Sequence, residues 1–260
     1  MWPRFLLRLL GAVAAPRSYW DWGAAVHMPE RPAQAAFALL AFALLAFALL
    51  PFALLLYPPA HADATSAGER PVRIVALGDS LTAGRGLPFD AAFPAKLQSA
   101  LNAKDRAVEI VNAGVSGDTA SGALARLDWS VPEGTDGVIV ELGANDMLLG
   151  MDPKVTRNAL EEIVRRLSAR GTVVLLAGMR AAPNLGADYA GAFEAIYSDI
   201  AAKYDVLLYP FFLDGVVANQ KLNQSDGIHP TSAGVDVIVA RILPKVEELL
   251  ARIRQKHDLR

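Results

Sequence analysis

The chain has 260 residues, a net charge of −2 and no cysteine. The absence of cysteine excludes disulfides and thiolate catalysis, and a charge this close to zero gives no reason to expect nucleic-acid binding. The length allows one large domain or two small ones, with a sizeable core.

The first part of the chain is strongly apolar. Residues 33–56 contain no charged side chain, and AFALL occurs three times in succession before PFALL at 51–55. A step of five residues turns about 140° on a helix of ~3.6 residues per turn, so the phenylalanines lie all round the helix. A helix that is apolar on every side belongs in a membrane or a buried core. We therefore predict a signal or anchor segment over 33–57.

A cleavage pattern follows the apolar run. Pro58 and Pro59 end the helix, and residues 60–62, Ala-His-Ala, match the small-x-small pattern of a signal peptidase site. The pattern predicts cleavage before Asp63. The alternative is an uncleaved anchor, because the run exceeds the roughly 7–15 apolar residues of an ordinary signal. Both alternatives predict that the remainder of the chain is exported.

We divide the chain into a leader (1–62), a linker (63–70) and one folded domain (71–255). Met28 precedes the apolar run and is an alternative start to Met1. The leader contains four arginines and two acidic residues, so the folded domain is more acidic than the whole chain. This charge gives the domain no electrostatic reason to bind anionic surfaces.

Apolar runs alternate with helical patterns along the folded domain. The predicted strands cover 72–80, 107–114, 136–143, 172–178 and 205–212. The predicted helices cover 92–103, 121–129, 153–171, 188–204 and 232–256, with an interruption of the last at Pro244. Strands that are apolar on both faces are typical of a parallel sheet covered on both sides. We predict a three-layer α/β/α sandwich with a central parallel sheet of about five strands and right-handed crossovers.

Polar residues occur where such a fold places its binding site, beyond the carboxyl ends of the strands. Ser80 stands at the end of the first predicted strand, Gly117 and Asn145 follow the next two, and Asp226 and His229 precede the last helix. Each has an ordinary explanation when taken alone, as a helix cap, a flexible loop or a solvated pair. Their joint occurrence at strand ends and loops favours a common site.

The same residues satisfy the requirements of acyl transfer. A serine hydroxyl needs an adjacent base, and His229 is the only histidine outside the leader and the charged C-terminal tail. Asp226, three residues away, is close enough to orient the imidazole. The backbone N–H groups of Ser80 and Gly117 and the amide of Asn145 are the natural donors to an oxyanion.

Four motifs then resemble those of the SGNH (GDSL) hydrolase family. They are Gly-Asp-Ser-Leu at 78–81, Ser-Gly-Asp-Thr at 116–119, Gly-Ala-Asn-Asp at 143–146 and Asp-Gly-Ile-His-Pro at 226–230. The chain looks most like the periplasmic arylesterase, thioesterase I and lysophospholipase L1 group, over about residues 71–250. The resemblance implies a flavodoxin-like SGNH fold, a periplasmic location and no metal or organic cofactor. It implies a catalytic triad of Ser80, Asp226 and His229, with Ser80, Gly117 and Asn145 forming the oxyanion hole.

The expected activity is hydrolysis of carboxylic esters and thioesters through an acyl-enzyme. The alternatives are a carbohydrate O-acetylesterase of the same superfamily and an exported binding domain without catalysis. We expect a monomer that acts on a small acyl ester or thioester, binds no nucleic acid and touches a membrane only through an uncleaved leader.

The resemblance also suggests residues on the substrate side. Asp79 and Leu81 flank Ser80 and are expected to contact the substrate. Residues 179–189 resemble a substrate-side loop, in which Asn184 and Leu185 are expected to belong to a mobile lid that helps to select the acyl group.

Overall fold

The computed structural model describes residues 70–104 and 106–259. The predicted leader, its apolar segment at 33–57, the cleavage site after Ala62 and residues 63–69 of the linker lie outside this part of the chain. Within residues 70–104 and 106–259, no helix combines the length and the apolar character that crossing a membrane requires.

A five-stranded sheet forms the centre of the domain, with strand order β2-β1-β3-β4-β5 and every pair parallel. The strands are β1 (Val72–Gly78), β2 (Val108–Gly114), β3 (Gly137–Glu141), β4 (Val173–Ala177) and β5 (Leu207–Tyr209). The predicted strands and the parallel sheet are confirmed. β5 is shorter than predicted because it is an edge strand with a single neighbour and is followed at once by Pro210, which cannot donate to a ladder.

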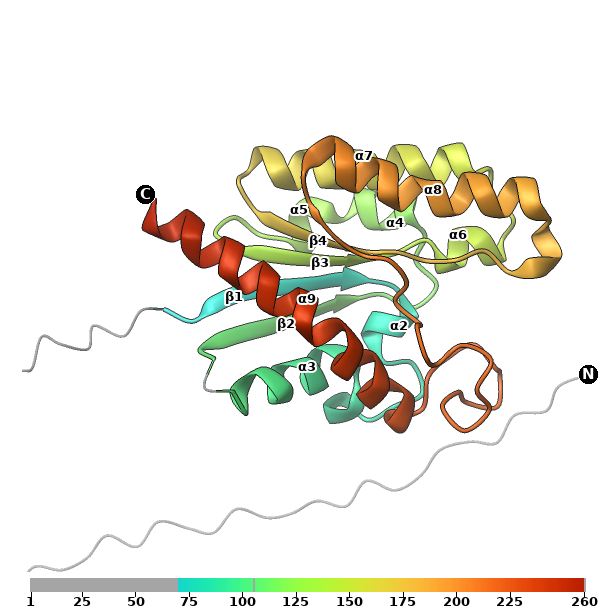
Figure 1. Ribbon diagram of the computed structural model, residues 1–260, viewed down its shortest axis with the longest axis horizontal. Helices are drawn as coiled ribbons and strands as arrows, with labels where there is room; N and C mark the ends of the chain where they lie inside the picture. Colours follow the sequence, from blue (N-terminus) through green and yellow to red (C-terminus); the bar gives the residue numbers. More distant parts are fainter. Residues whose placement is uncertain (1–69, 105, 260) are drawn as a thin grey trace, which may run out of the picture. The chain divides into compact units, whose positions relative to one another are not determined.

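Helices cover both faces of this sheet, as the three-layer prediction requires. α3 and α9 lie on one face, and α4, α7 and α8 lie on the other (Figure 1). The helix bounds are α2 (Ser80–Ala83), α3 (Phe93–Asn102), α4 (Ala120–Ala125), α5 (Leu127–Ser130), α6 (Ala144–Leu148), α7 (Pro153–Ala169), α8 (Ala187–Tyr204) and α9 (Ser232–Asp258), with 3-10 turns η2 (Phe89–Ala91) and η3 (Pro183–Leu185).

The predicted interruption at Pro244 is wrong. α9 runs unbroken through this proline, although proline inside a helix costs about 3 kcal/mol. Ile242 and Val246, on either side of it, are fully buried. Burying two such side chains contributes roughly 1.5–3 kcal/mol each, so packing outweighs the penalty.

The predicted helix at 121–129 is two helices, α4 and α5, which meet at Arg126. The short helices α2 and α6, which carry Ser80 and Asn145, were not predicted. Each has only about one turn, and one turn is too short to show a readable 3.6-residue period.

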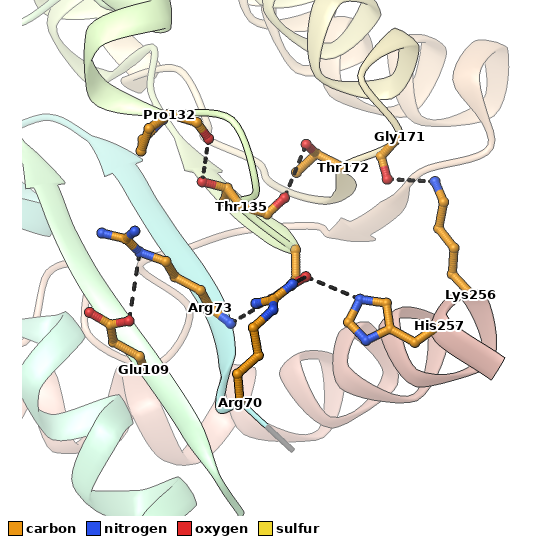
Figure 2. A network of polar contacts seen from close by, with 10 residues as sticks. Arg70, Arg73, Glu109, Pro132, Thr135, Gly171, Thr172, Lys256 and His257 are labelled. Atoms are coloured by element: carbon orange, nitrogen blue, oxygen red, sulfur yellow. Dashed lines mark hydrogen bonds and ion pairs between the residues drawn. The ribbon is translucent and has the colours of Figure 1, made fainter. Parts of the chain in front are cut away.

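A network of polar side chains lies at the amino ends of the strands. Asp136 accepts two hydrogen bonds from the Arg70 guanidinium and one from the Arg73 N–H, and it lies 3.0 Å from Nε2 of His257. Figure 2 shows Arg70, Arg73 and His257 converging there. Burial opposes ionisation of Asp136, but these hydrogen bonds hold its pKa below the ordinary value. The network ties the starts of β1 and β3 to the end of α9.

Candidate active site

A tight turn at the end of β1 presents Ser80. Asp79 caps α2 through Oδ1, which accepts the Leu81 N–H over 2.9 Å. A Cβ at Gly78 would lie 2.1 Å from Oγ1 of Thr82 and 2.8 Å from the Glu141 carbonyl oxygen. Only glycine lets the strand enter this turn so closely. The result is a serine at the carboxyl end of β1, an inner strand of the sheet.

Ser80, His229 and Asp226 form one hydrogen-bonded chain. Ser80 Oγ lies 2.8 Å from Nε2 of His229, and Nδ1 of His229 lies 2.7 Å from Oδ2 of Asp226. Oδ1 of Asp226 accepts the N–H groups of Ile228 and His229 over 2.9 and 3.0 Å. The His229 N–H and side chain, followed by the Ile228 N–H, hold the pKa of Asp226 well below its ordinary value. An ionised carboxylate therefore faces the imidazole.

Two further groups from neighbouring strand ends reach the same cavity. Gly117, after β2, has φ +87° and open space where a Cβ would stand. Asn145 is the second residue of α6, whose N-cap Gly143 has a φ of +108°. The Asn145 Nδ2 donates to Oδ2 of Asp79 over 3.0 Å and to the carbonyl oxygen of Asp118 over 2.9 Å. These two acceptors hold the amide in one orientation, and an oxyanion in the cavity would share or replace one of them as acceptor.

Two buried acids lie beneath the turn. Asp79 and Glu141 have no exposed surface. Burial raises the pKa of Asp79 to about 6. Burial, and next the charge of Asp79, raises the pKa of Glu141 well above its ordinary value. The Thr82 hydroxyl donates to Oε2 of Glu141 over 2.7 Å, whereas Oε1 has no hydrogen-bond partner among the described residues. Sequence reasoning missed Glu141, although an acid at the end of an apolar strand was a readable signal.

A cavity of about 660 Å³ opens over this site. Ser80, His229, Gly117 and Asn145 line it together with two arginines, Arg85 and Arg180. Most of the remaining wall is apolar, from Leu81, Ala144, Met147, Leu148, Met179, Ala181, Ala182, Pro183, Phe211, Leu213, Val217 and Ile228. Such a space is suited to an acyl chain that ends at a polar reacting centre.

Of the four residues expected to contact the substrate, only one lines the cavity. Leu81 lines the cavity. Asp79 is fully buried and does not line it, so its contacts are with the turn and with Asn145. Asn184 and Leu185 lie on η3 and also stand outside the lining, to which Pro183 of the same turn belongs. Among the residues that the structure describes, no three His, Asp or Glu side chains gather as metal ligands.

Comparison with known proteins identifies the family. Residues 76–237 match the model of the GDSL-like Lipase/Acylhydrolase family, and the chain belongs to that family. It is 38% identical to Esterase TesA of Pseudomonas aeruginosa over 178 residues, which are 68% of this chain and 89% of the relative. It is 40% identical over 158 residues to Thioesterase 1/protease 1/lysophospholipase L1 of Escherichia coli K12, covering 60% of this chain and 74% of the relative.

Solved structures agree with this assignment. The crystal structure of TesA matches with a TM-score of 0.65 at 37% identity, covering 68% of this chain and 99% of that one. AlinE4, an SGNH-hydrolase family esterase, matches with a TM-score of 0.59 at 44% identity, covering 71% and 99%. The expected SGNH fold and family are confirmed, and the protein is a hydrolase of ester bonds.

Proposed function

We propose that the protein is a serine esterase that cleaves carboxylic esters and thioesters of small acyl substrates, with Ser80 as nucleophile. The observation that carries the proposal is the chain of contacts from Ser80 through His229 to Asp226, at 2.8 and 2.7 Å. This is the arrangement in which a histidine base activates a serine and a carboxylate orients the base. Its position in a largely apolar cavity supports an acyl substrate.

The proposed reaction has two halves. His229 Nε2 takes the Ser80 proton while Oγ attacks the carbonyl carbon, and Asp226 stabilises the imidazolium. His229 then protonates the leaving alcohol or thiol, and the carbon–oxygen or carbon–sulfur bond breaks to leave the acyl-enzyme. A water that gives its proton to His229 attacks the ester, and Ser80 recovers its proton as the acid leaves.

The N–H groups of Ser80 and Gly117 and the Nδ2 of Asn145 are the proposed oxyanion donors. Two observations support them: all three residues line the cavity, and the positive φ of Gly117 is accompanied by open space beside its Cα. Removing one donor of this kind costs on the order of 10²–10³ in rate.

Replacement of the nucleophile tests the proposal. Ser80→Ala is expected to abolish hydrolysis of p-nitrophenyl esters and acyl thioesters while the domain stays folded. Ser198→Ala is a matched control, because Ser198 is an exposed serine on α8 and its loss is expected to leave the rate unchanged. Normal turnover by Ser80→Ala would refute the proposal.

The apolar wall of the cavity favours acyl chains longer than acetyl over the O-acetylesterase alternative. A series of p-nitrophenyl esters from acetate to dodecanoate, run beside acetylated xylan, separates the two. We expect kcat/KM to rise beyond acetate. A preference for acetylated glycan would instead favour the deacetylase.

The leader pattern supports an exported, periplasmic enzyme whose membrane contact is confined to the N-terminal segment. We propose that this enzyme acts as a monomer and has no nucleic-acid partner. Cleavage before Asp63 is tested by sequencing the N-terminus of the protein recovered from the periplasm. A membrane-bound product that retains residues 33–57 would favour the uncleaved anchor.

A further inference from the structure

Arg126, between α4 and α5, holds three backbone segments at the carboxyl end of the sheet. Its Nε donates to Oδ2 of Asp118 over 2.7 Å, and its Nη2 donates to the Gly78 carbonyl over 3.0 Å. Its Nη1 donates to the Ala113 carbonyl over 2.9 Å and to Oγ of Ser130 over 2.8 Å. The Arg126 and Asp118 side chains are only 16% and 13% exposed. All three guanidinium nitrogens are therefore used inside the domain.

The segments that Arg126 holds carry two of the proposed oxyanion donors, Ser80 and Gly117, and contact the third, Asn145. Gly78 is the last residue of β1 and precedes Ser80 by two positions. Asp118 directly follows Gly117, so anchoring its carboxylate fixes the direction of that peptide. The carbonyl oxygen of Asp118 also accepts a hydrogen from the Asn145 amide. Each donor lies within two residues, or one hydrogen bond, of a group bound to Arg126.

We propose that Arg126 is the positioning residue of the oxyanion hole, which keeps the donors from Ser80, Gly117 and Asn145 in mutual register. The inference rests on the proposed function, because it gives these groups their task. Arg126 does not line the cavity, so it acts through Asp118 and Gly78 and not on the substrate itself. Preorganised donors stabilise the transition state only while they stay aimed at the developing charge.

The shape of the guanidinium explains why arginine occupies this position. Its donors stand in a rigid planar fork that can bind a carboxylate and several carbonyls at once. A lysine ammonium is a single charged group on a flexible stem. It cannot bind, at the same time, the several acceptors that surround the planar guanidinium. Arg126→Lys is therefore expected to keep the positive charge but to lose the alignment of the three oxyanion donors.

A second substitution reaches the same contact without touching Arg126. A Cβ at Gly122 would lie 2.0 Å from Oδ1 of Asp118, and Gly122 is inside α4, where alanine is otherwise favourable. Gly122→Ala is thus expected to displace the Asp118 carboxylate from Arg126. It gives an independent test of the proposal if replacement of Arg126 prevents folding.

The experiment compares kcat and KM for p-nitrophenyl butyrate in Arg126→Met, Arg126→Lys and Gly122→Ala, with folding followed by circular dichroism. We expect kcat to fall about 10- to 100-fold in the folded variants while KM changes less than about threefold, as for an interaction made in the transition state. Arg165→Met is the control, because Arg165 pairs with Glu162 on the exposed face of α7. Its kinetics are expected to be normal.

A double variant separates positioning from general support of the fold. If Arg126 acts through the oxyanion hole, Arg126→Met combined with Asn145→Ala is expected to lose less activity than the product of the two single losses, because part of the effect of Arg126 passes through the Asn145 amide. Full multiplication of the two losses would overturn the proposal. So would a normal kcat in folded Arg126→Lys and Gly122→Ala.

The proposed function fails separately from this inference. Activity that survives in Ser80→Ala refutes the proposed function and the inference with it. An inactive Ser80→Ala beside normal Arg126 and Gly122 variants refutes the inference alone.

Discussion

The Asn145 side-chain amide donates to Oδ2 of Asp79 over 3.0 Å. The residue directly before the proposed nucleophile thus holds the amide that is proposed to receive the oxyanion. Asp79 also caps the turn through the Leu81 N–H. A single buried carboxylate therefore links the position of Ser80 to the orientation of Asn145.

This link predicts the effect of Asp79→Ala. The amide of Asn145 loses one of its two acceptors, and the turn loses its cap. We expect kcat to fall by at least about tenfold with a smaller change in KM, since the loss concerns groups that act in the transition state. Steady-state kinetics on p-nitrophenyl butyrate check this. Unchanged kcat in the folded variant would show that Asp79 has no part in orienting Asn145.

The buried acids predict a pH dependence of stability. The pKa of Asp79 is raised from 3.8 to about 6, and that of Glu141 is raised well above 4.5. Ionising a group with a raised folded pKa costs more in the folded state, so its stabilisation is present below the unfolded pKa and is lost as the pH rises through the folded value. We expect the free energy of unfolding to decline from pH 3.8 upward on account of Asp79, and from pH 4.5 upward on account of Glu141 as well.

Glu141→Gln isolates this contribution. The amide is neutral at every pH and nearly the same size, so the variant is expected to lose less stability than the parent between mildly acidic and neutral pH. Urea denaturation at about pH 5 and pH 7.5 measures the difference. A variant with the same decline as the parent would mean that Glu141 does not titrate in this range.

The contribution of Asp226 to stability changes with pH in the opposite direction. Its pKa is depressed, so the stability it contributes is present above the unfolded value of 3.8 and is lost as the pH falls through the folded value.

Asp226→Asn is expected to lower kcat by about 10⁴-fold, because the neutral amide no longer holds the imidazole in the required tautomer. The matched control is Asp188→Asn, on the exposed start of α8. A loss below about tenfold would contradict a triad role for Asp226.

The rim of the cavity predicts acyl-chain preference. Val217 and Ile228 line the cavity and are 56% and 42% exposed, so their apolar surfaces are open to a chain that leaves it. Val217→Asp is expected to lower kcat/KM for dodecanoyl esters about 10- to 100-fold and to leave acetyl esters within about threefold. Val155→Asp, on exposed α7 surface, is the control. Equal losses on both esters would argue against an acyl contact at Val217.

Much of this arrangement could be predicted from the sequence, because it depends on local pattern. Apolar runs of strand length indicated the parallel sheet, and polar residues after those runs indicated its active edge. The spacing of Asp226 and His229 likewise allowed for the contact that the structure contains. The helix through Pro244 could not be predicted, because its stability comes from buried contacts distant in sequence.

The supporting groups of the site were beyond sequence reasoning for a related reason. Asp79 was expected to face the substrate. It is instead fully buried, and it accepts a hydrogen bond from Asn145 of α6, a contact between residues 66 positions apart. Arg126 lies in a segment that reads as ordinary helix, and its partners Gly78, Ala113 and Asp118 come from three separate strand ends and loops. Long-range hydrogen bonds of this kind leave no periodic signal.

The role of Ser80 as nucleophile is tested most directly by mapping the residue that a reactive phosphonate modifies. The folded protein is treated with a fluorophosphonate, digested, and analysed by mass spectrometry, beside Ser80→Ala and Ser198→Ala. We expect one phosphonyl adduct on Ser80, formed in Ser198→Ala but absent from Ser80→Ala, with activity lost in step with labelling. An adduct on another residue, or full esterase activity with Ser80 unmodified, would contradict it.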